Sequence, residues 1–299
     1  MAQETFAFFY EVQGMAPGAT HGPAQSISTT LVELASDTGG IDGSTSPGDE
    51  IDWSSSGFTG PFTYIALTQN NEPIVEDFDS GVRFVLSNDG TRESDPVTPN
   101  SAPYTYCFAA GTLIATPSGA RPVENLSIGD AVLTADGKTV AVKWLGRQTL
   151  RKFLNGTRIQ PVRIQAGALG DGLPHRDLTV TGEHGLVFEG LVINAAALVN
   201  GTTINWVPLA ELDDSVTYYH VETENHDVIL AEGAAAETFI DYLDRCGFDN
   251  YQEYLDLYGA ERVIHEMPLP RISAGRLVPG AIKALLGSRA PARPNSLAG

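Results

Sequence analysis

Short runs of alternating apolar and polar residues recur through the first hundred positions of the chain. They are rich in β-branched and aromatic residues, and clusters of Gly, Ser, Asp and Pro, such as the run at 37–50, separate them. Alternation with a period of two residues is typical of strands with one buried face, and such clusters are typical of turns. The pattern predicts strands at 5–12, 26–34, 62–68 and 82–86. We therefore expect residues 1–94 to form a small β-sandwich or β-barrel.

A second β-rich pattern starts at Cys107, after a segment of different composition. Residues 95–106, DPVTPNSAPYTY, contain three prolines and few large aliphatic side chains, which favours an extended linker. Beyond the linker the pattern predicts nine short strands, at 111–116, 131–133, 139–145, 160–165, 178–181, 185–188, 203–207, 217–222 and 228–231. Short strands at such close spacing, with Gly or Pro in the turns between them, indicate a second, coiled all-β domain.

Helical periodicity appears only after residue 234. Phe239, Leu243 and Cys246 share one apolar stripe, and the tyrosine-rich run at 251–258 carries a second stripe with Asp249 as its N-cap. We therefore expect short helices at the C-terminal end of the second domain, which we place at residues 107–262.

The remaining residues, 263–299, are basic. After Glu266 this segment holds no acidic residue and five basic ones. A polar segment with charge of one sign is typical of disorder, and the alternative is a segment that lies on an acidic surface or a membrane. We predict a disordered tail. The chain as a whole is then expected to have two all-β domains, a linker between them and this tail.

The net charge of −19 is concentrated in the first domain, because residues 1–106 carry 15 acidic and two basic side chains. Such a field repels nucleic acid, which excludes nucleic-acid binding. No run approaches 18 apolar residues, and the N-terminus has no basic leader, which argues against a membrane-spanning helix and a standard secretory signal. Two cysteines do not make a disulfide scaffold. The localisation stays open between the cytoplasm and export without a cleaved leader, which the acidic composition favours.

Acidic clusters in the first domain raise the question of a bound cation. Two of them supply the oxygen ligands that Ca²⁺ prefers, namely Asp49, Glu50 and Asp52, and Glu76, Asp77 and Asp79. Their spacing fits neither an EF-hand loop nor a glycine-rich nonapeptide repeat. We therefore interpret them as a solvated acidic surface, with Ca²⁺ as the alternative, and expect no other cofactor or metal.

The chemically informative stretch is CFAAGTLIATPSGARPVENLSIGDAVLTADGKTVAVKWLG at 107–146. It places a cysteine first in the second domain, and T-G-E-H follows at 181–184 and HVETENHDVILAEG at 220–233. The motifs CF-x-x-GT, V-E-x-L-x-x-GD-x-V and T-x-x-H resemble those of the Hint domain, which Hedgehog autoprocessing domains and inteins share. They are most similar to the bacterial Hint-type domains that follow secreted-type β modules. The resemblance covers residues 107 to about 245 and implies a Hint-type coiled β fold.

The resemblance also implies that the chain processes itself. The Cys107 thiol is intrinsically nucleophilic, and its sulfur can reach the carbonyl carbon of Tyr106 through a five-membered ring. This N–S acyl shift converts the Tyr106–Cys107 amide to a thioester, which water, a small thiol, an amine or an alcohol then traps. We predict that His184 protonates the departing amine and that Thr181 holds the scissile unit twisted. The substrate is the protein's own N-terminal domain, released as residues 1–106.

His226 matches a late histidine of the family and is a further candidate catalytic residue. Splicing inteins end in His-Asn, whereas residues 233–238 read GAAAET, so we expect cleavage without splicing. Hedgehog domains carry an aspartate between the first strands and T-x-x-H, whereas residues 137–170 contain no acidic side chain. This difference argues against sterol transfer.

Each candidate also has a purely structural interpretation. Cys107 fits a buried apolar residue, Thr181 a strand former, His184 a core histidine and His226 a turn residue. We interpret His175 and His220 as structural. The main alternative function is therefore an inert Hint scaffold in a secreted binding or adhesin-type protein. A general cysteine protease is a weaker alternative, because nothing in the sequence suggests a substrate groove.

Overall fold

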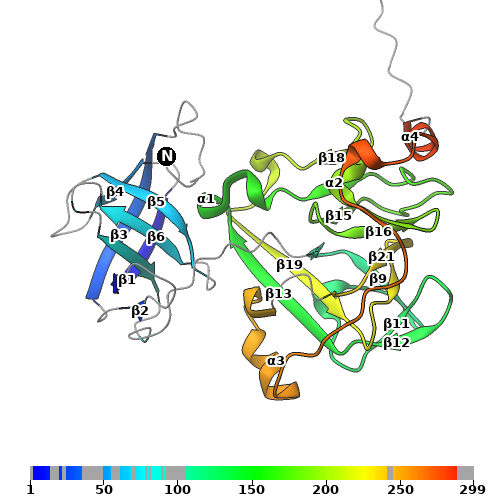
Figure 1. Ribbon diagram of the computed structural model, residues 1–299, viewed down its shortest axis with the longest axis horizontal. Helices are drawn as coiled ribbons and strands as arrows, with labels where there is room; N and C mark the ends of the chain where they lie inside the picture. Colours follow the sequence, from blue (N-terminus) through cyan, green and yellow to red (C-terminus); the bar gives the residue numbers. More distant parts are fainter. Residues whose placement is uncertain are drawn as a thin grey trace, which may run out of the picture. The chain divides into compact units, whose positions relative to one another are not determined.

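The computed structural model divides the chain into two compact units (Figure 1). The first contains Met1–Ala102, Leu150–Ile159 and Leu212–Val216, and the second contains Pro103–Thr149, Gln160–Glu211 and Thr217–Gly299. The structure describes residues 3–13, 20–21, 25–35, 50–54, 61–68, 72–77, 80, 82–88, 91, 106–240 and 245–287. Within these ranges no helix is long and apolar enough to cross a membrane.

The first unit holds a small antiparallel β-barrel. Its strands are β1 (Gln3–Gln13), β2 (Thr20–His21), β3 (Gln25–Ala35), β4 (Glu50–Ser54), β5 (Pro61–Leu67), β6 (Pro73–Asp77) and β7 (Arg83–Ser87). Their order is β2-β1-β3-β4-β5-β6-β7, and β1 also pairs with β7, where Tyr10 lies opposite Val85. This second pairing closes the sheet on itself, which removes the exposed edges of the first and last strands.

Irregular strand pairing bends the sheet into this closed form. The register shifts between Phe6 and Phe8 of β1, and again between Tyr64 and Ala66 of β5. Such bulges increase the local bend and twist of a strand. The predicted strands correspond to β1, β3, β5 and β7, and of the two alternatives for this domain the structure has the barrel. The sequence prediction missed β4 and also β6, which begins with a proline, a residue that normally argues against a strand.

The second unit contains two large sheets and a small hairpin, so the all-β prediction is confirmed here too. The first sheet has the order β10-β9-β20-β21-β16-β17-β22 and the second has the order β13-β19-β8-β15-β14-β18. The hairpin joins β11 and β12. Their bounds are β8 Phe108–Ala109, β9 Leu113–Thr116, β10 Gly119–Pro122, β11 Ala131–Leu133, β12 Thr139–Ala141, β13 Trp144–Arg151, β14 Val162–Ile164, β15 Leu178–Val180, β16 Gly185–Phe188, β17 Leu191–Asn194, β18 Ile204–Trp206, β19 Ser215–Glu222, β20 Val228–Ala231, β21 Ala234–Glu237 and β22 Arg271–Ile272.

Two tight hairpins of the first large sheet fix the strands that flank the candidate site. The β16–β17 turn has positive φ angles at Glu189 (52°) and Gly190 (75°), and the β20–β21 turn has them at Glu232 (48°) and Gly233 (84°). Positive φ at both central residues is the conformation of a two-residue turn that matches the twist of its strands. A glycine at the second position makes this conformation accessible.

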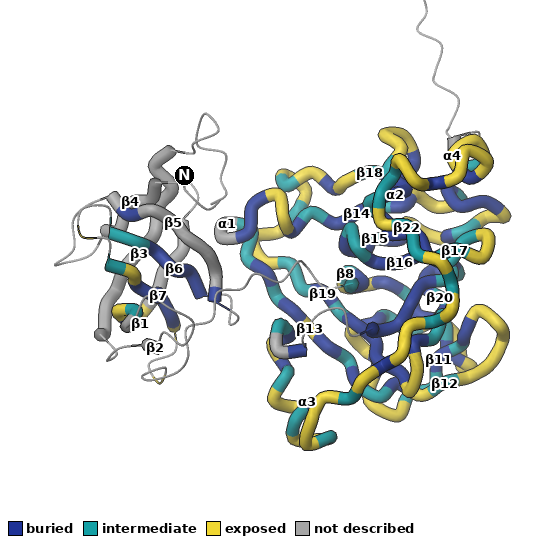
Figure 2. The backbone as a smooth tube through the Cα atoms, viewed as in Figure 1, coloured by how far each residue is buried: buried dark blue, intermediate teal, exposed yellow. Residues whose placement is uncertain are grey.

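Buried apolar residues from both large sheets form one core (Figure 2). Phe108 and Val180 come from the second sheet, and Ile114, Ile193 and Ile229 come from the first. All five are fully buried. The core therefore holds the two sheets in a fixed relation, and the junction residue Cys107 enters it directly ahead of Phe108.

The helices are short: α1 Lys152–Asn155, α2 Ala195–Leu198, α3 Tyr251–Tyr258 and α4 Gly280–Gly287. The helix predicted at 251–258 is α3, but Asn250 stands at its N-cap and the Asp249 carboxylate instead accepts the Thr149 N–H at 2.9 Å. The other predicted stripe includes residues 241–244, which lie outside the described part of the chain.

The segment after residue 263 differs from the disordered tail that the sequence predicts. It contains β22, which runs parallel to β17 with Arg271 opposite Val192, and it ends in α4. Val278, Ile282 and Leu286 are buried in the core of the second unit. The sequence prediction gave weight to the basic charge and overlooked this spacing of four residues, which places all three side chains on one face. Residues 288–299 lie outside the described part.

We expect Ile282→Ala to lower the free energy of unfolding by about 2–5 kcal/mol, because it removes a buried side chain from α4. Lys283→Ala changes the exposed neighbour and should stay within about 0.5 kcal/mol of the unsubstituted protein. Urea denaturation followed by tryptophan fluorescence, in a Cys107→Ala background, measures both. Equal, small effects of the two substitutions would contradict the packing of α4 on the core.

Candidate active site at the Tyr106–Cys107 junction

Cys107 lies between two strands that bring separate polar side chains to it. The next residue, Phe108, pairs with Val180 of β15 on one side and with Tyr219 of β19 on the other. Thr181 directly follows Val180, and His220 directly follows Tyr219. Because both pairings are antiparallel, they place Thr181 and His220 on either side of Cys107. The Cys107 side chain is fully buried.

Thr181 holds the backbone of Cys107. The Cys107 N–H, which belongs to the Tyr106–Cys107 amide, donates a hydrogen bond of 2.9 Å to the Thr181 Oγ1. The Thr181 N–H donates to the Cys107 carbonyl, also at 2.9 Å. These two bonds fix the nitrogen of the Tyr106–Cys107 amide from the β15 side.

His220 faces the Cys107 sulfur, with 3.8 Å between Sγ and Nδ1. Its ring lies 5.1 Å from the Phe239 ring, centroid to centroid, in an edge-on arrangement. Burial lowers the pKa of His220 well below its usual value, and the neighbouring His184 lowers it further. The ring is therefore neutral near pH 7. The sequence interpretation of His220 as a structural residue overlooked this position.

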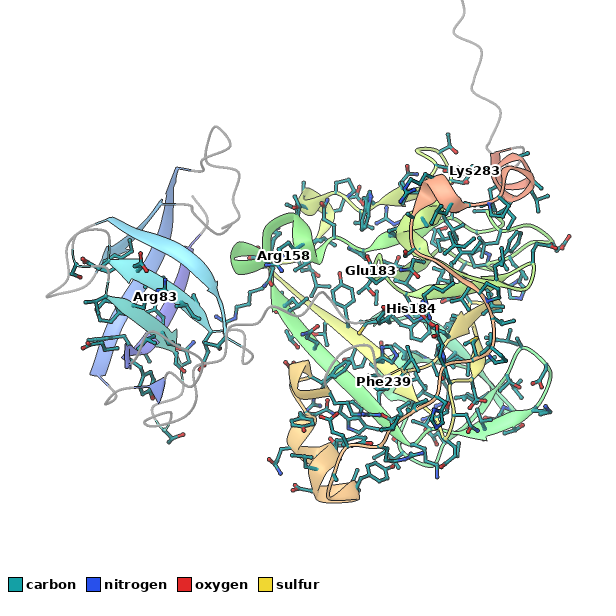
Figure 3. The ribbon with its side chains drawn as sticks, in the orientation of Figure 1. Arg83, Arg158, Glu183, His184, Phe239 and Lys283 are labelled. Atoms are coloured by element: carbon teal, nitrogen blue, oxygen red, sulfur yellow. The ribbon has the colours of Figure 1, made fainter. Side chains whose placement is uncertain are left out.

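His184 stands in the interior of the second unit at the end of the turn that follows β15 (Figure 3). Its N–H donates to the Thr181 carbonyl at 3.1 Å, so the T-x-x-H motif is one compact turn. The His184 ring packs 4.3 Å from the Phe108 ring and 6.0 Å from the His220 ring, measured between centroids. Neither ring nitrogen has a hydrogen-bond partner of good geometry among the described residues.

The electrostatic surroundings of His184 set its protonation state. Complete burial lowers its pKa to about 4, which the charge of Glu237 and a hydrogen-bonding interaction with the Tyr106 backbone oppose only in part. His184 is therefore neutral near pH 7. The ring packs against Phe108, two residues along the chain from Tyr106.

Glu237, at the end of β21, is a buried carboxylate behind His184. It accepts the N–H of Gly185 at 2.6 Å, and it also bonds the His226 Nε2 and the guanidinium of Arg271. Burial raises the pKa of Glu237, but the hydrogen bonds from His226 and Arg271 outweigh it and hold the pKa at about 2. Glu237 therefore stays ionised, and its charge acts on His184.

His226 reaches the site through Glu237 rather than through the Cys107 sulfur. Its Nε2 lies 3.0 Å from a Glu237 oxygen, and its Nδ1 accepts the N–H of Met267 at 3.1 Å. Because Nδ1 is an acceptor, the ring proton sits on Nε2 and points at the carboxylate. The geometry therefore gives His226 a supporting position.

Arg271, at the start of β22, joins the same cluster. Besides Glu237, its guanidinium contacts Asn194 Oδ1 at 3.1 Å and Glu266 at 3.5 Å. It also lies over the Tyr106 ring, 5.5 Å from the centroid. Asn194 in turn donates to the Glu183 carboxylate at 2.6 Å.

The structure thus brings four of the predicted residues together: Tyr106, Cys107, Thr181 and His184. It adds His220, Glu237 and Arg271, none of which the sequence analysis selected. Glu237 lay in the segment considered only for its missing asparagine, and Arg271 lay in the segment predicted to be a tail. Of the three, only His220 had a signal in the sequence, as a histidine within the predicted strand 217–222.

Comparison with known protein families finds a match over the part of the chain that holds Cys107, Thr181 and His184. A family model described as "Hint domain" matches residues 106–242. Residues 106–242 are a Hint domain. The sequence resemblance is therefore confirmed, and the match implies a capacity for autoprocessing in general. A search of curated proteins found no match.

Several solved structures resemble the Hint domain at low identity. A crystal structure of the MchDnaB-1 intein (N145AA) is 20% identical, covers 44% of this chain and 99% of its own, and has a TM-score of 0.34. A crystal structure of the gp41-1 intein is 16% identical, covers 44% of this chain and 96% of its own, and has a TM-score of 0.33. A solution structure of a bacterial intein-like domain from Clostridium thermocellum is 15% identical, covers 46% of this chain and 100% of its own, and has a TM-score of 0.33. The identification depends on the family match, because likenesses at this level are too weak to carry it.

The acidic clusters of the barrel are only partly described. Asp49 and Asp79 lie outside the described residues. The Glu76 carboxylate accepts a hydrogen bond of 2.7 Å from Arg83, and Asp77 accepts two from Ser80, also at 2.7 Å. Both carboxylates thus have partners within the barrel.

We expect the free energy of unfolding to fall as the pH is lowered from about 6.5 to about 4. In this window unfolded chains protonate His184, whereas the folded protein, with a His184 pKa of about 4, does not. The loss attributable to His184 is on the order of 3 kcal/mol, and His220 acts in the same direction. His184→Gln should flatten the slope, and substitution of the exposed His175 by Gln should leave it unchanged. Urea denaturation at several pH values between 7 and 4, in a Cys107→Ala background, measures how the free energy of unfolding of each variant depends on pH.

We expect Glu237→Gln to lower the free energy of unfolding by about 3–5 kcal/mol, because it leaves the largely buried Arg271 guanidinium without its counter-charge. Glu266→Gln removes a more exposed partner of the same arginine and should cost less than about 1 kcal/mol. Thermal and urea unfolding of the two variants compare them. A loss of similar size in both would rule out a special role for the buried pair.

Proposed function

We propose that the chain cuts itself at the Tyr106–Cys107 bond by an N–S acyl shift, without splicing. This proposal depends on one observation: Cys107 is contacted from both sides. Thr181 accepts a hydrogen bond from its amide nitrogen, and His220 lies against its sulfur. The amide nitrogen and the sulfur are the two atoms between which the acyl group moves. A buried structural cysteine requires neither contact.

The reaction conserves protons. The thiol proton passes to His220 Nδ1, 3.8 Å away, and the sulfur forms a bond to the Tyr106 carbonyl carbon. The carbon–nitrogen bond then breaks, and its electron pair goes to the Cys107 nitrogen. That nitrogen takes the proton back from the His220 imidazolium, which leaves a thioester and a free amine.

His184 takes a different part from the one predicted from the sequence. With a pKa of about 4 the ring is neutral near pH 7 and has no acidic proton to give the amine. A neutral imidazole N–H can instead donate to the Tyr106 carbonyl oxygen, where negative charge develops during the attack. The interaction of His184 with the Tyr106 backbone supports this assignment. Loose hydrogen-bond geometry is common before a reactive complex forms.

Thr181 orients the scissile amide. Its hydroxyl accepts the Cys107 N–H and holds the nitrogen toward β15, and we propose that His184 holds the carbonyl oxygen of Tyr106 from the other side during the attack. Opposed contacts of this kind favour a twisted amide, in which resonance is weakened and the carbon is easier to attack. Glu237 and His226 act behind His184 and fix its electrostatic surroundings.

The C-terminal side of the Hint domain lacks what a second cut would need. The stretch 233–238 holds no asparagine, and the hydroxyl of Thr238 at its end accepts the Asp227 N–H at 2.9 Å. The chain then continues into α3 and β22, and β22 completes the first large sheet. We therefore propose one cut, which releases residues 1–106 to water or a small nucleophile.

An inert scaffold is the second candidate, and the complete burial of Cys107 favours it. An external nucleophile has to reach the thioester, and a closed site slows that step. The inert-scaffold hypothesis does not explain the contact between the Cys107 Sγ and His220, whereas the self-cleavage hypothesis gives that contact a role in proton transfer.

Intact-mass spectrometry of the purified chain, with and without dithiothreitol or hydroxylamine, tests the proposal. Either reagent should cut the chain between Tyr106 and Cys107, since both attack thioesters. Cys107→Ala should abolish the cut, and His220→Gln should slow it at least tenfold by removing the base at the sulfur.

Cys246→Ala is the matched control, because it removes the other cysteine of the sequence and should leave cleavage intact. An uncut chain under all conditions would favour the inert scaffold. Cleavage that survives Cys107→Ala would place the chemistry elsewhere.

A further inference from the structure

We propose that Arg271 is a specificity-determining residue, which holds the aromatic side chain on the N-terminal side of the cut. This inference rests on the proposed self-cleavage and adds which residue the site accepts before Cys107. It also gives a role to a segment beyond residues 106–242, the range that the family model matches.

The contact between the two side chains is direct. The Arg271 guanidinium carbon lies 5.5 Å from the centroid of the Tyr106 ring, within the range in which a cation attracts the face of an aromatic ring. Tyr106 is half-buried, and the Arg271 side chain is 16% exposed. Such an attraction is stronger in a partly dry site than at an exposed surface.

The charges around the phenol agree with this contact. Burial raises the pKa of Tyr106, and the nearby charge of Arg271 pulls the pKa in the opposite direction. The carboxylates of Glu237, Glu183 and Glu266 act on the phenol more weakly. Arg271 is therefore the dominant charge that the Tyr106 side chain meets.

Among the described residues, the side chains of Glu237, Asn194 and Glu266 bond the guanidinium and hold it in place. Glu237 contributes most, because it is fully buried and contacts two of the guanidinium nitrogens. A guanidinium restrained in this way presents a fixed face to the Tyr106 ring. A flexible arginine would lose more side-chain entropy on making the same contact.

The same restraint connects Tyr106 with His184. Glu237 accepts the N–H of Gly185, the residue that directly follows His184. A Cβ at Gly185 would collide with the Glu237 carboxylate, so the close approach requires glycine. Arg271 thus couples the position of the Tyr106 side chain to the turn that places His184 beside the Tyr106 backbone.

Cleavage rates of junction variants test this inference in the full-length chain. With Arg271 present, Tyr106→Phe should cut about as fast as the unsubstituted chain, because the ring is kept. Tyr106→Leu should cut about tenfold more slowly, because it removes the aromatic face. The measured quantity is the ratio of the dithiothreitol-induced rates of these two variants.

The ratio should fall when Arg271 is changed. In an Arg271→Gln background it should approach one, and in an Arg271→Lys background it should fall to about three, since lysine keeps the charge but loses the planar group. A purely structural role for Arg271 lowers every rate by the same factor and leaves the ratio at about ten. Arg276→Gln changes an exposed arginine of the same segment and is the control that should not alter it.

Unfolding curves in a Cys107→Ala background show which variants remain folded. Should Arg271→Gln unfold, the Arg271→Lys arm still decides the question through the same ratio. An unchanged ratio in a chain that does cut itself overturns the role of Arg271 and leaves the proposed function standing. No cleavage of the unsubstituted chain overturns both.

Discussion

The candidate site depends on one structural constraint, the position of the two-residue strand β8 between β15 and β19. Phe108 pairs with both neighbours, and its fully buried ring is part of the core. Cys107 therefore has no freedom to move away from Thr181 or His220. Thr181 and His220, which are 74 and 113 residues from Cys107 in sequence, are held beside it by one short strand and the core beneath that strand.

Buried charge is the second element of the design. Glu237 has lost its hydration, which by itself would favour the protonated acid, yet Arg271 and His226 keep it ionised. The two histidines nearer the junction have no such partners and remain neutral because burial dominates. Glu237 and Arg271 thus form a charged layer behind the neutral layer of His184 and His220. This arrangement suits a reaction in which one proton moves between neighbouring groups. It also makes the site sensitive to the loss of any one member of the charged layer.

Local sequence patterns predicted local structure well and long-range contacts poorly. The strands at 185–188 and 228–231 have the predicted bounds, because strong apolar runs end there in turn residues. The motif T-x-x-H led to Thr181 and His184 because the sequence resemblance carries their proximity to the first cysteine. His220 could not be found in this way, since its value depends on the pairing of β19 with β8. Arg271 was hidden by a different effect, because the basic composition of the last segment concealed three apolar residues at helical spacing.

The burial of Cys107 has a consequence for the direction of the chemistry. The amine freed at its nitrogen would appear in an enclosed space, beside two histidines that burial keeps uncharged. A protonated amine is disfavoured there for the same reason, and an uncharged amine remains a good nucleophile. It can therefore attack the thioester and restore the original peptide bond. Under the proposed acyl shift the junction would exchange reversibly between amide and thioester, and the arrival of an outside nucleophile, rather than the first step, would decide when the two halves separate.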